Sequence, residues 1–263
     1  MSRVLSKKAF AVESVKDGKL YQFVVLMENR PGALATAVSL VAKNNLTALS
    51  GFHCVDPKNN WEEWSFFADF SKAAVTPEQV CSELSKDSVV KKVEYRRSEF
   101  QDLAVDEVHF PIVTGDGDRA VFLREGTFGV AIEKLWNVFG PGAGTILWEM
   151  GRAAGDFEAK RVREKLRLNQ ADALKYLLAD KRASGWYIGQ IEEVATSPVK
   201  LIAKVEHSIE CEHRSSKHSA PMGFLLKGYL NGYISFILEK ELKIKELRCR
   251  AKGDSFCEFQ LTE

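Results

Sequence analysis

A short pattern of cysteine and glutamate residues near the C-terminus is the part of the sequence best suited to chemistry. Glu246, Cys249 and Cys257 fall on two segments that we predict to be the strands of a closing hairpin, Lys243–Cys249 and Cys257–Leu261. Two thiolates and a carboxylate on adjacent hairpin strands suit tetrahedral zinc. The alternative is that both cysteines are reduced and buried, where cysteine behaves as a small apolar residue.

The residues around this pattern resemble the 4-vinyl reductase domain family. The resemblance rests on five short stretches: Gly151–Gly155, Ser208–Cys211, Gly228–Tyr233, Glu246–Cys249 and Lys252–Phe259. It covers about residues 108–263 and implies an α/β domain with helices packed on a small antiparallel sheet. The family shares this fold with vesicle-tethering subunits and with the sensor domains of aromatic-responsive transcription activators.

The resemblance also implies a metal site. In those sensor domains the glutamate and the two cysteines join a third cysteine, just before the Gly-Tyr helix, to hold zinc. This chain has Met222-Gly223 at that place, so Cys211, His213 or His218 would have to supply the fourth donor. The candidate ligands of a structural zinc ion are Glu246, Cys249, Cys257 and Cys211.

A ligand cavity is the other property that this resemblance implies. It would lie between the helices and the sheet and take apolar or aromatic molecules, as small-molecule pockets generally do. The candidate wall residues are Trp136, Trp148, Trp186, Phe224 and Tyr229, together with Phe139 and Tyr187. A plain core explains the same residues, because aromatic side chains dominate protein cores.

The N-terminal part of the chain shows a different order of elements. We predict a strand, a helix, two strands, a helix and a strand over Leu20–Met27, Ala33–Lys43, Leu46–Val55, Trp61–Phe70, Thr76–Leu84 and Val89–Tyr95. Asp56–Asn60 is the predicted hairpin turn between the second and third strands. This βαββαβ order is the ferredoxin-like arrangement.

The stretch Asn29–Leu34 (NRPGAL), between the first strand and the first helix, resembles the ACT domain family over residues 20–97. The resemblance implies a homodimer and an amino-acid effector bound near this loop. The candidate effector-binding residues are Asn29, Arg30, Pro31, Gly32, Ala33 and Leu34, since Gly32 lets a ligand approach and a helix N-terminus offers N–H groups to a carboxylate. A simple tight turn is the alternative. Thr47-Ala48 departs from the family pattern, so a second alternative is a domain that dimerises without binding an effector.

These elements predict two domains in an α/β (α+β) chain. An ACT-like domain would occupy residues 1–97, with its core at 20–97, and a polar linker residues 98–107. A 4-vinyl-reductase-like domain would occupy residues 108–263, with its motif core at 199–263. In this second domain we expect helices at about 126–139, 143–152 and 224–239, with long helical stretches that continue from the second helix to Arg182.

Composition narrows the function classes. The 263 residues include 37 basic and 36 acidic side chains, a balance that gives no reason to expect a nucleic acid or an anionic membrane as partner. No run of 18 apolar residues is present, and the N-terminus lacks the apolar stretch of a secretion signal. Five cysteines, an odd number, do not suggest a disulfide framework, so we expect a cytoplasmic location.

The sequence contains none of the common catalytic signatures, such as GxSxG, HExxH or a Walker A loop. Gly115–Asp118 (GDGD) is better explained as a hairpin turn than as a calcium loop. We therefore predict a non-enzymatic small-molecule sensor that signals through a protein partner. A dimeric scaffold without ligand and an enzyme of tetrapyrrole metabolism are the alternatives.

Overall fold

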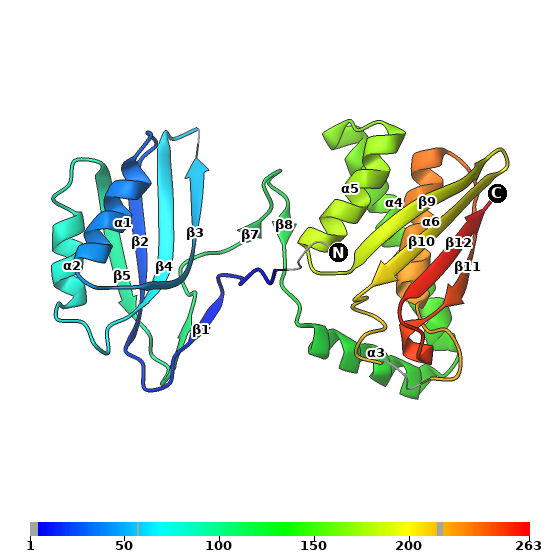
Figure 1. The fold of residues 1–263 in the computed structure, drawn as a ribbon, viewed down its shortest axis with the longest axis horizontal. Helices are drawn as coiled ribbons and strands as arrows, with labels where there is room; N and C mark the ends of the chain where they lie inside the picture. Colours follow the sequence, from blue (N-terminus) through cyan, green and yellow to red (C-terminus); the bar gives the residue numbers. More distant parts are fainter. Residues whose placement is uncertain (1–4, 57, 215–217) are drawn as a thin grey trace. The chain divides into compact units, whose positions relative to one another are not determined.

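The structure is a computed structural model that describes residues 5–56, 58–214 and 218–263. Residues 1–4 of the first predicted domain and Pro57 of the predicted turn lie outside the described residues. The chain divides into two compact units, with the boundary between Ala120 and Val121. Each unit combines helices with an antiparallel sheet, which confirms the predicted fold class (Figure 1). No helix in the described part of the chain has the length and apolar character that crossing a membrane requires.

The N-terminal unit contains a four-stranded antiparallel sheet in the order β3-β4-β2-β5. Its elements are β2 (Leu20–Glu28), α1 (Ala33–Lys43), β3 (Ala48–Asp56), β4 (Trp61–Asp69), α2 (Pro77–Leu84) and β5 (Val90–Arg97). Their βαββαβ order along the chain and their pairing in the sheet match the predicted ferredoxin-like arrangement.

Both helices of this unit pack on one face of the sheet (Figure 1). α1 buries Ala37 and Val41 against a cluster that includes Phe23 and Phe66 from the two central strands. α2 begins at a capping box, in which the Thr76 side chain accepts from the Gln79 amide and the Gln79 side chain accepts from the Thr76 amide. The predicted helix start at Thr76 is therefore correct.

A pair of short strands covers the second face. β1 (Val12–Ser14) pairs antiparallel with β6 (Leu103–Val105), and Ala104 of β6 is buried with Leu20 and Phe67. The structure therefore places a strand inside the predicted linker 98–107. This pairing joins segments about 90 residues apart along the chain, so neither segment carries a local signal for it. β7 (Ile112–Val113) and β8 (Arg119–Ala120) then form a hairpin around the predicted Gly115–Asp118 turn.

A polar cluster lies on this second face of the sheet. His109 is held between two carboxylates, with Nδ1 2.8 Å from the Asp106 carboxylate and Nε2 2.7 Å from Glu63 Oε1. Gln22 donates to Asp106 at 2.7 Å, and Ser65 donates to Glu63 at 2.7 Å. Burial lowers the pKa of His109, but the bonds to Asp106 and Glu63 outweigh it and raise that pKa to about 9. The imidazole is therefore a cation in a buried ion-pair network.

The C-terminal unit contains a second four-stranded antiparallel sheet, in the order β11-β12-β10-β9. Its elements are α3 (Glu125–Phe139), α4 (Gly142–Arg161), the π-helical turn η1 (Val162–Leu166), α5 (Gln170–Ala183), β9 (Ile188–Thr196), β10 (Val199–Glu206), α6 (Phe224–Leu238), β11 (Lys243–Arg248), the 3₁₀ turn η2 (Arg250–Lys252) and β12 (Cys257–Thr262). α4 runs on to Arg161 and α5 follows as far as Ala183, in agreement with the helical stretches predicted up to Arg182.

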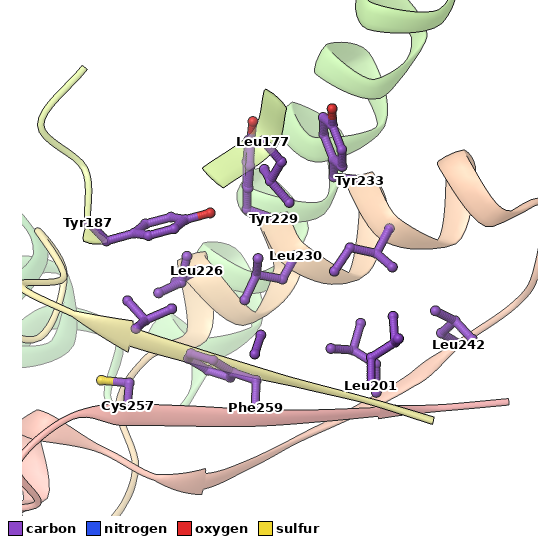
Figure 2. Packing of buried hydrophobic residues seen from close by; sticks show 14 of the residues in the cluster. Leu177, Tyr187, Leu201, Leu226, Tyr229, Leu230, Tyr233, Leu242, Cys257 and Phe259 are labelled. Atoms are coloured by element: carbon purple, nitrogen blue, oxygen red, sulfur yellow. The ribbon is translucent and has the colours of Figure 1, made fainter. Parts of the chain in front are cut away.

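The core of this unit lies between α6 and the sheet. Figure 2 shows Cys257 and Phe259 of β12 beneath Leu226 and Leu230 of α6, with Tyr187 entering from the side. All five side chains are buried. α6 is apolar on nearly its whole circumference, which is the pattern of a helix covered on all sides.

The opposite side of α6 lies against α4 with almost no side chain between the two backbones. A Cβ atom added to Gly151 would be 2.0 Å from the carbonyl oxygen of Leu225, and one added to Gly228 would be 2.2 Å from that of Trp148. Gly155 and Gly232 make equally close contacts one turn further along. The four glycines thus allow a separation between the two helices that any larger residue would prevent.

The glycine contact gives a first prediction. We expect Gly151→Ala to lower the free energy of unfolding by about 3 kcal/mol, because the new methyl group must force α4 and α6 apart. Gly126→Ala is the matched control, since its Cβ would meet nothing within 4 Å and alanine is the better helix former. Urea unfolding of both variants measures the difference. Equal stabilities would contradict the close packing of the helix pair.

The His109 network gives a second prediction, which concerns pH. Because the pKa of His109 is raised from its ordinary 6.5 to about 9, its contribution to stability is complete below pH 6.5 and lost as pH rises through 9. We expect His109→Gln to be less stable than wild type by on the order of 2 kcal/mol at pH 6 and by much less at pH 10. Denaturant unfolding at both values checks this, and a difference that does not change with pH would contradict it.

Candidate functional site

Four potential metal ligands meet at one end of the C-terminal unit. Cys211 lies on a turn after β10, Glu246 on β11, Cys249 just after β11, and Cys257 at the start of β12. Their donor atoms all lie within 4.8 Å of one another, and all four residues are buried. These are the four candidate ligands that we named from the sequence, and the fold brings them together from three separate segments.

The local backbone explains how the hairpin offers its two cysteines. After Cys249 the chain makes a tight turn in which Gly253 has φ +109°, a value that favours glycine. The amide of Cys249 donates to the Asp254 carboxylate at 2.8 Å, and the amide of Arg250 donates to Cys257 Sγ at 3.3 Å. These bonds hold both sulfur atoms on the same side of the turn.

The donor set fits a divalent metal ion. The Sγ atoms of Cys211 and Cys249 are 3.8 Å apart, and a tetrahedral zinc with Zn–S bonds of about 2.3 Å needs about that separation. Glu246 Oε1 is buried and accepts no hydrogen bond from any described residue, so one strong acceptor is left for a cation. All five cysteines are free thiols, so no disulfide competes for these sulfur atoms.

At the start of α6, Met222-Gly223 contacts the metal-ligating cluster through its backbone. The amide of Met222 donates to Cys249 Sγ at 3.3 Å, and the amide of Gly223 donates to Glu246 Oε2 at 3.1 Å. A Cβ on residue 223 would lie 2.9 Å from Glu246 Oε1 and displace the carboxylate. This segment therefore supplies backbone donors, while Cys211 supplies the third thiol.

Neither of the two histidines considered as substitutes belongs to the cluster of metal-ligating side chains found among the described residues. The ring of His213 packs against α3, where a Cβ on Gly129 would lie 2.6 Å away from it. His218 donates its backbone amide to Ala251.

The electrostatics of the cluster follow from its burial. Desolvation raises the pKa of Glu246 to about 9, because a carboxylate there has little access to water. Hydrogen bonds from Cys211 and Cys257 lower the pKa of Cys249, which also accepts the Met222 amide. A metal ion bound by these groups would favour the ionised form of each of them.

Glu210 is a functional residue that our sequence analysis did not assign a role. Its carboxylate accepts from the amides of Leu225 and Leu226 at 3.0 and 2.9 Å and caps α6, whose N-cap residue Gly223 supplies no side-chain cap. Desolvation raises the pKa of Glu210 to about 7 in spite of these bonds. The absence of a Ser, Thr, Asp or Asn before Phe224 was the signal that a cap must come from elsewhere.

The five predicted pocket residues occupy three places in the C-terminal unit. The rings of Trp136 and Phe224 are 5.5 Å apart, and so are those of Trp186 and Tyr229. Trp148 instead lines an open groove between α4, α6 and β11.

The surroundings of Tyr229 combine aromatic rings with buried polar groups. The hydroxyl groups of Tyr229 and Tyr187 are buried and lack a hydrogen-bond partner within the described residues. Lys181 Nζ lies 5.0 Å from the ring centres of both Trp186 and Tyr229. Polar groups in a mostly aromatic and aliphatic surrounding are the usual means by which a pocket orients a ligand.

The predicted effector loop lies at the N-terminus of α1. Gly32 has φ +92°, which favours glycine, and open space surrounds its Cα. Ala33, the first residue of α1, is buried, while Arg30 is exposed and 3.3 Å from the Glu28 carboxylate. Of the other predicted residues, Pro31 is exposed and Asn29 is partly exposed, whereas Leu34 lies in α1 and packs against the core.

The polar cluster of the N-terminal unit has the arrangement of a serine hydrolase triad, since His109 lies between Asp106 and Ser65, with Ser65 Oγ 3.2 Å from Nε2. Ser65 is fully buried, and Glu63 occupies the same imidazole nitrogen at 2.7 Å. A histidine that donates to carboxylates on both sides cannot accept a proton from serine. We therefore interpret the cluster as structural.

Residues 201–263 match the family model of the V4R domain. The chain is similar to the solved phenol-responsive sensory domain of the transcription activator PoxR (18% identity, 56% of this chain and 77% of that chain, TM-score 0.49). It is also similar to a vinyl-4-reductase family protein from Methanocaldococcus jannaschii (18% identity, 55% of this chain and 83% of that chain, TM-score 0.40). A third similar structure is trafficking protein particle complex subunit 3 from Naegleria fowleri (12% identity, 52% of this chain and 91% of that chain, TM-score 0.40). A search of curated proteins gave no match.

The matched range contains α6, the closing hairpin and all four donors of the metal-ligating cluster. The ACT resemblance of residues 20–97 stays a prediction. The C-terminal part of this chain is a V4R domain.

Proposed function

We propose that this chain is a non-enzymatic regulatory protein whose V4R domain binds an apolar or aromatic small molecule. The observation that carries the proposal is the pair of buried, unpartnered hydroxyl groups of Tyr187 and Tyr229. A buried hydroxyl without a partner costs about 1–3 kcal/mol, and a ligand with one polar atom would recover that energy. Lys181, whose Nζ pairs with the Asp180 carboxylate at 2.8 Å and lies 5.0 Å from the Tyr229 ring centre, would offer a ligand a further hydrogen-bond donor.

We further propose that the domain holds a structural zinc ion through Cys211, Cys249, Cys257 and Glu246. Four protein ligands leave no open position for a substrate, which is the usual form of a structural site. The ion would supply a cross-link between the turn after β10 and the closing hairpin. The chain's own amides at Met222 and Gly223 would orient Cys249 and Glu246 and tie the start of α6 to the same point.

The N-terminal unit would add an amino-acid effector site at Asn29–Leu34 and would form a homodimer. Its accessible loop and the glycine geometry at Gly32 support this part of the proposal. Output would pass through a protein partner, with no direct role for nucleic acid or membrane. The two units would be coupled if each ligand favours one arrangement of the domains.

A scaffold without ligand is the second candidate function. The observation that favours it is the filling of the space beside α6, where Tyr187, Tyr229 and Tyr233 are all buried. The Tyr233 hydroxyl is satisfied, since it donates to the Ala173 carbonyl at 2.9 Å. In a scaffold the two unpartnered hydroxyl groups would only lower the stability of the fold. The two candidate functions therefore differ in whether the Tyr229 hydroxyl binds a ligand.

Metal content is the first test. We expect one zinc ion per chain in protein purified without chelator, and we expect Cys257→Ser to lose it together with much of its thermal stability. Cys54→Ser is the matched control, because Cys54 is an exposed free thiol in the N-terminal unit. Elemental analysis and thermal unfolding measure both effects. A zinc content near zero in the wild type would refute the metal site.

Ligand binding is the second test, by thermal-shift screening against phenols, aromatic acids and amino acids. We expect a compound of the aromatic classes to stabilise the wild type and to lose that effect in Tyr229→Phe. The unliganded Tyr229→Phe protein should be as stable as wild type or more so by about 1 kcal/mol, because an unpaired buried hydroxyl is removed.

Tyr233→Phe, one turn away on the same helix, is the control for this test. It should lose about 1 kcal/mol of stability because its hydroxyl is paired, and it should still respond to the ligand. If no aromatic compound stabilises the wild type, the scaffold replaces the sensor.

A further inference from the structure

Arg214 is the largest fully buried side chain of the described residues, with an exposed fraction of 0%. Its Nε, Nη1 and Nη2 atoms are buried and have no hydrogen-bond partner among the described atoms. The backbone fixes its place, because the amide of Arg214 donates to the Cys211 carbonyl at 3.2 Å and so sets the two residues on one turn. An arginine buried without any pair is costly, so the structure must contain a reason for it.

The groups around Arg214 are mainly acidic. Desolvation lowers the pKa of Arg214, and the negative groups that oppose this effect are Glu210, Cys211, Glu133 and Cys249. On its other side the guanidinium lies 5.6 Å from the ring centre of Trp136, on α3. Two of the four acidic groups, Cys211 and Cys249, are members of the metal-ligating cluster.

The net negative charge of the metal-loaded cluster would balance the positive charge of the Arg214 guanidinium. Three thiolates and one carboxylate carry four negative charges, so a divalent ion leaves two of them uncompensated in a buried site. Glu210 adds a further acidic group next to Cys211. We propose that Arg214 is the buried counter-cation of the metal-loaded cluster, and that it positions the turn bearing Cys211.

The local charge also favours a counter-cation role for Arg214 over a role in binding an anionic ligand. A ligand anion beside Arg214 would add its charge to the negative groups that already act electrostatically on the guanidinium. Such an arrangement disfavours further negative charge. The same residue anchors α3 through the Trp136 ring, so metal loading and the docking of α3 would be coupled through Arg214. This inference rests on the zinc site proposed above.

The test compares metal affinity with metal-free stability. We expect Arg214→Met and Arg214→Gln to weaken zinc binding about 10- to 100-fold in competition with a chromogenic chelator, which is the usual effect of a lost supporting group. Arg214→Lys keeps the charge and should stay within about threefold of wild type. In the zinc-free state Arg214→Met should melt at the same temperature as wild type or higher, because it removes an unpaired buried cation.

Arg161→Met is the matched control in the same unit. Arg161 is half-buried, lies 5.9 Å from the ring centre of Tyr176 and pairs with Glu158, so its loss should reduce stability without changing zinc affinity. A purely structural Arg214 would behave like Arg161.

Three results would overturn the proposal. They are neutral variants that bind zinc as tightly as wild type, a lysine variant as weak as the neutral ones, and neutral variants that fold neither with nor without zinc. If the wild type binds no zinc, the metal site itself is refuted. If the wild type binds zinc and the neutral variants have the same zinc affinity, only the role of Arg214 is refuted.

Discussion

The N-terminus of α6 is the point on which the C-terminal unit depends. The amides at residues 222, 223, 225 and 226 donate to three acidic side chains, Cys249, Glu246 and Glu210, which come from two different parts of the chain. The partial positive charge of a helix N-terminus favours negative groups at this end. The turn after β10, the closing hairpin and α6 therefore share one electrostatic centre, and each holds the others in register.

Much of this arrangement could be predicted from local patterns. The spacing of Glu246, Cys249 and Cys257 and the hairpin that carries them were visible in the sequence, as were the capping residue Thr76 and the paired glycines of α6. Each of these signals lies within a few residues of the element that it specifies. Cys211 was one of three possible fourth donors, and only the fold distinguishes it from His213 and His218.

The features that could not be predicted depend on contacts between distant segments. Ala104 gives no sign that its strand pairs with β1, because a three-residue strand gains its stability from its partner. Arg214 and Glu210 look like ordinary surface residues in the sequence, since charged residues are rarely buried unless paired. Their role follows only from the acidic groups that the fold places around them.

The contact between α4 and α6 has a mechanical consequence. Because the two backbones touch at four glycines, neither helix can slide or rotate against the other without a steric clash. The pair must therefore move as one rigid body. Any conformational signal generated inside this domain would have to be carried by the elements that pack around the pair through side chains, namely α3 and α5, for which rotamer changes can absorb a displacement.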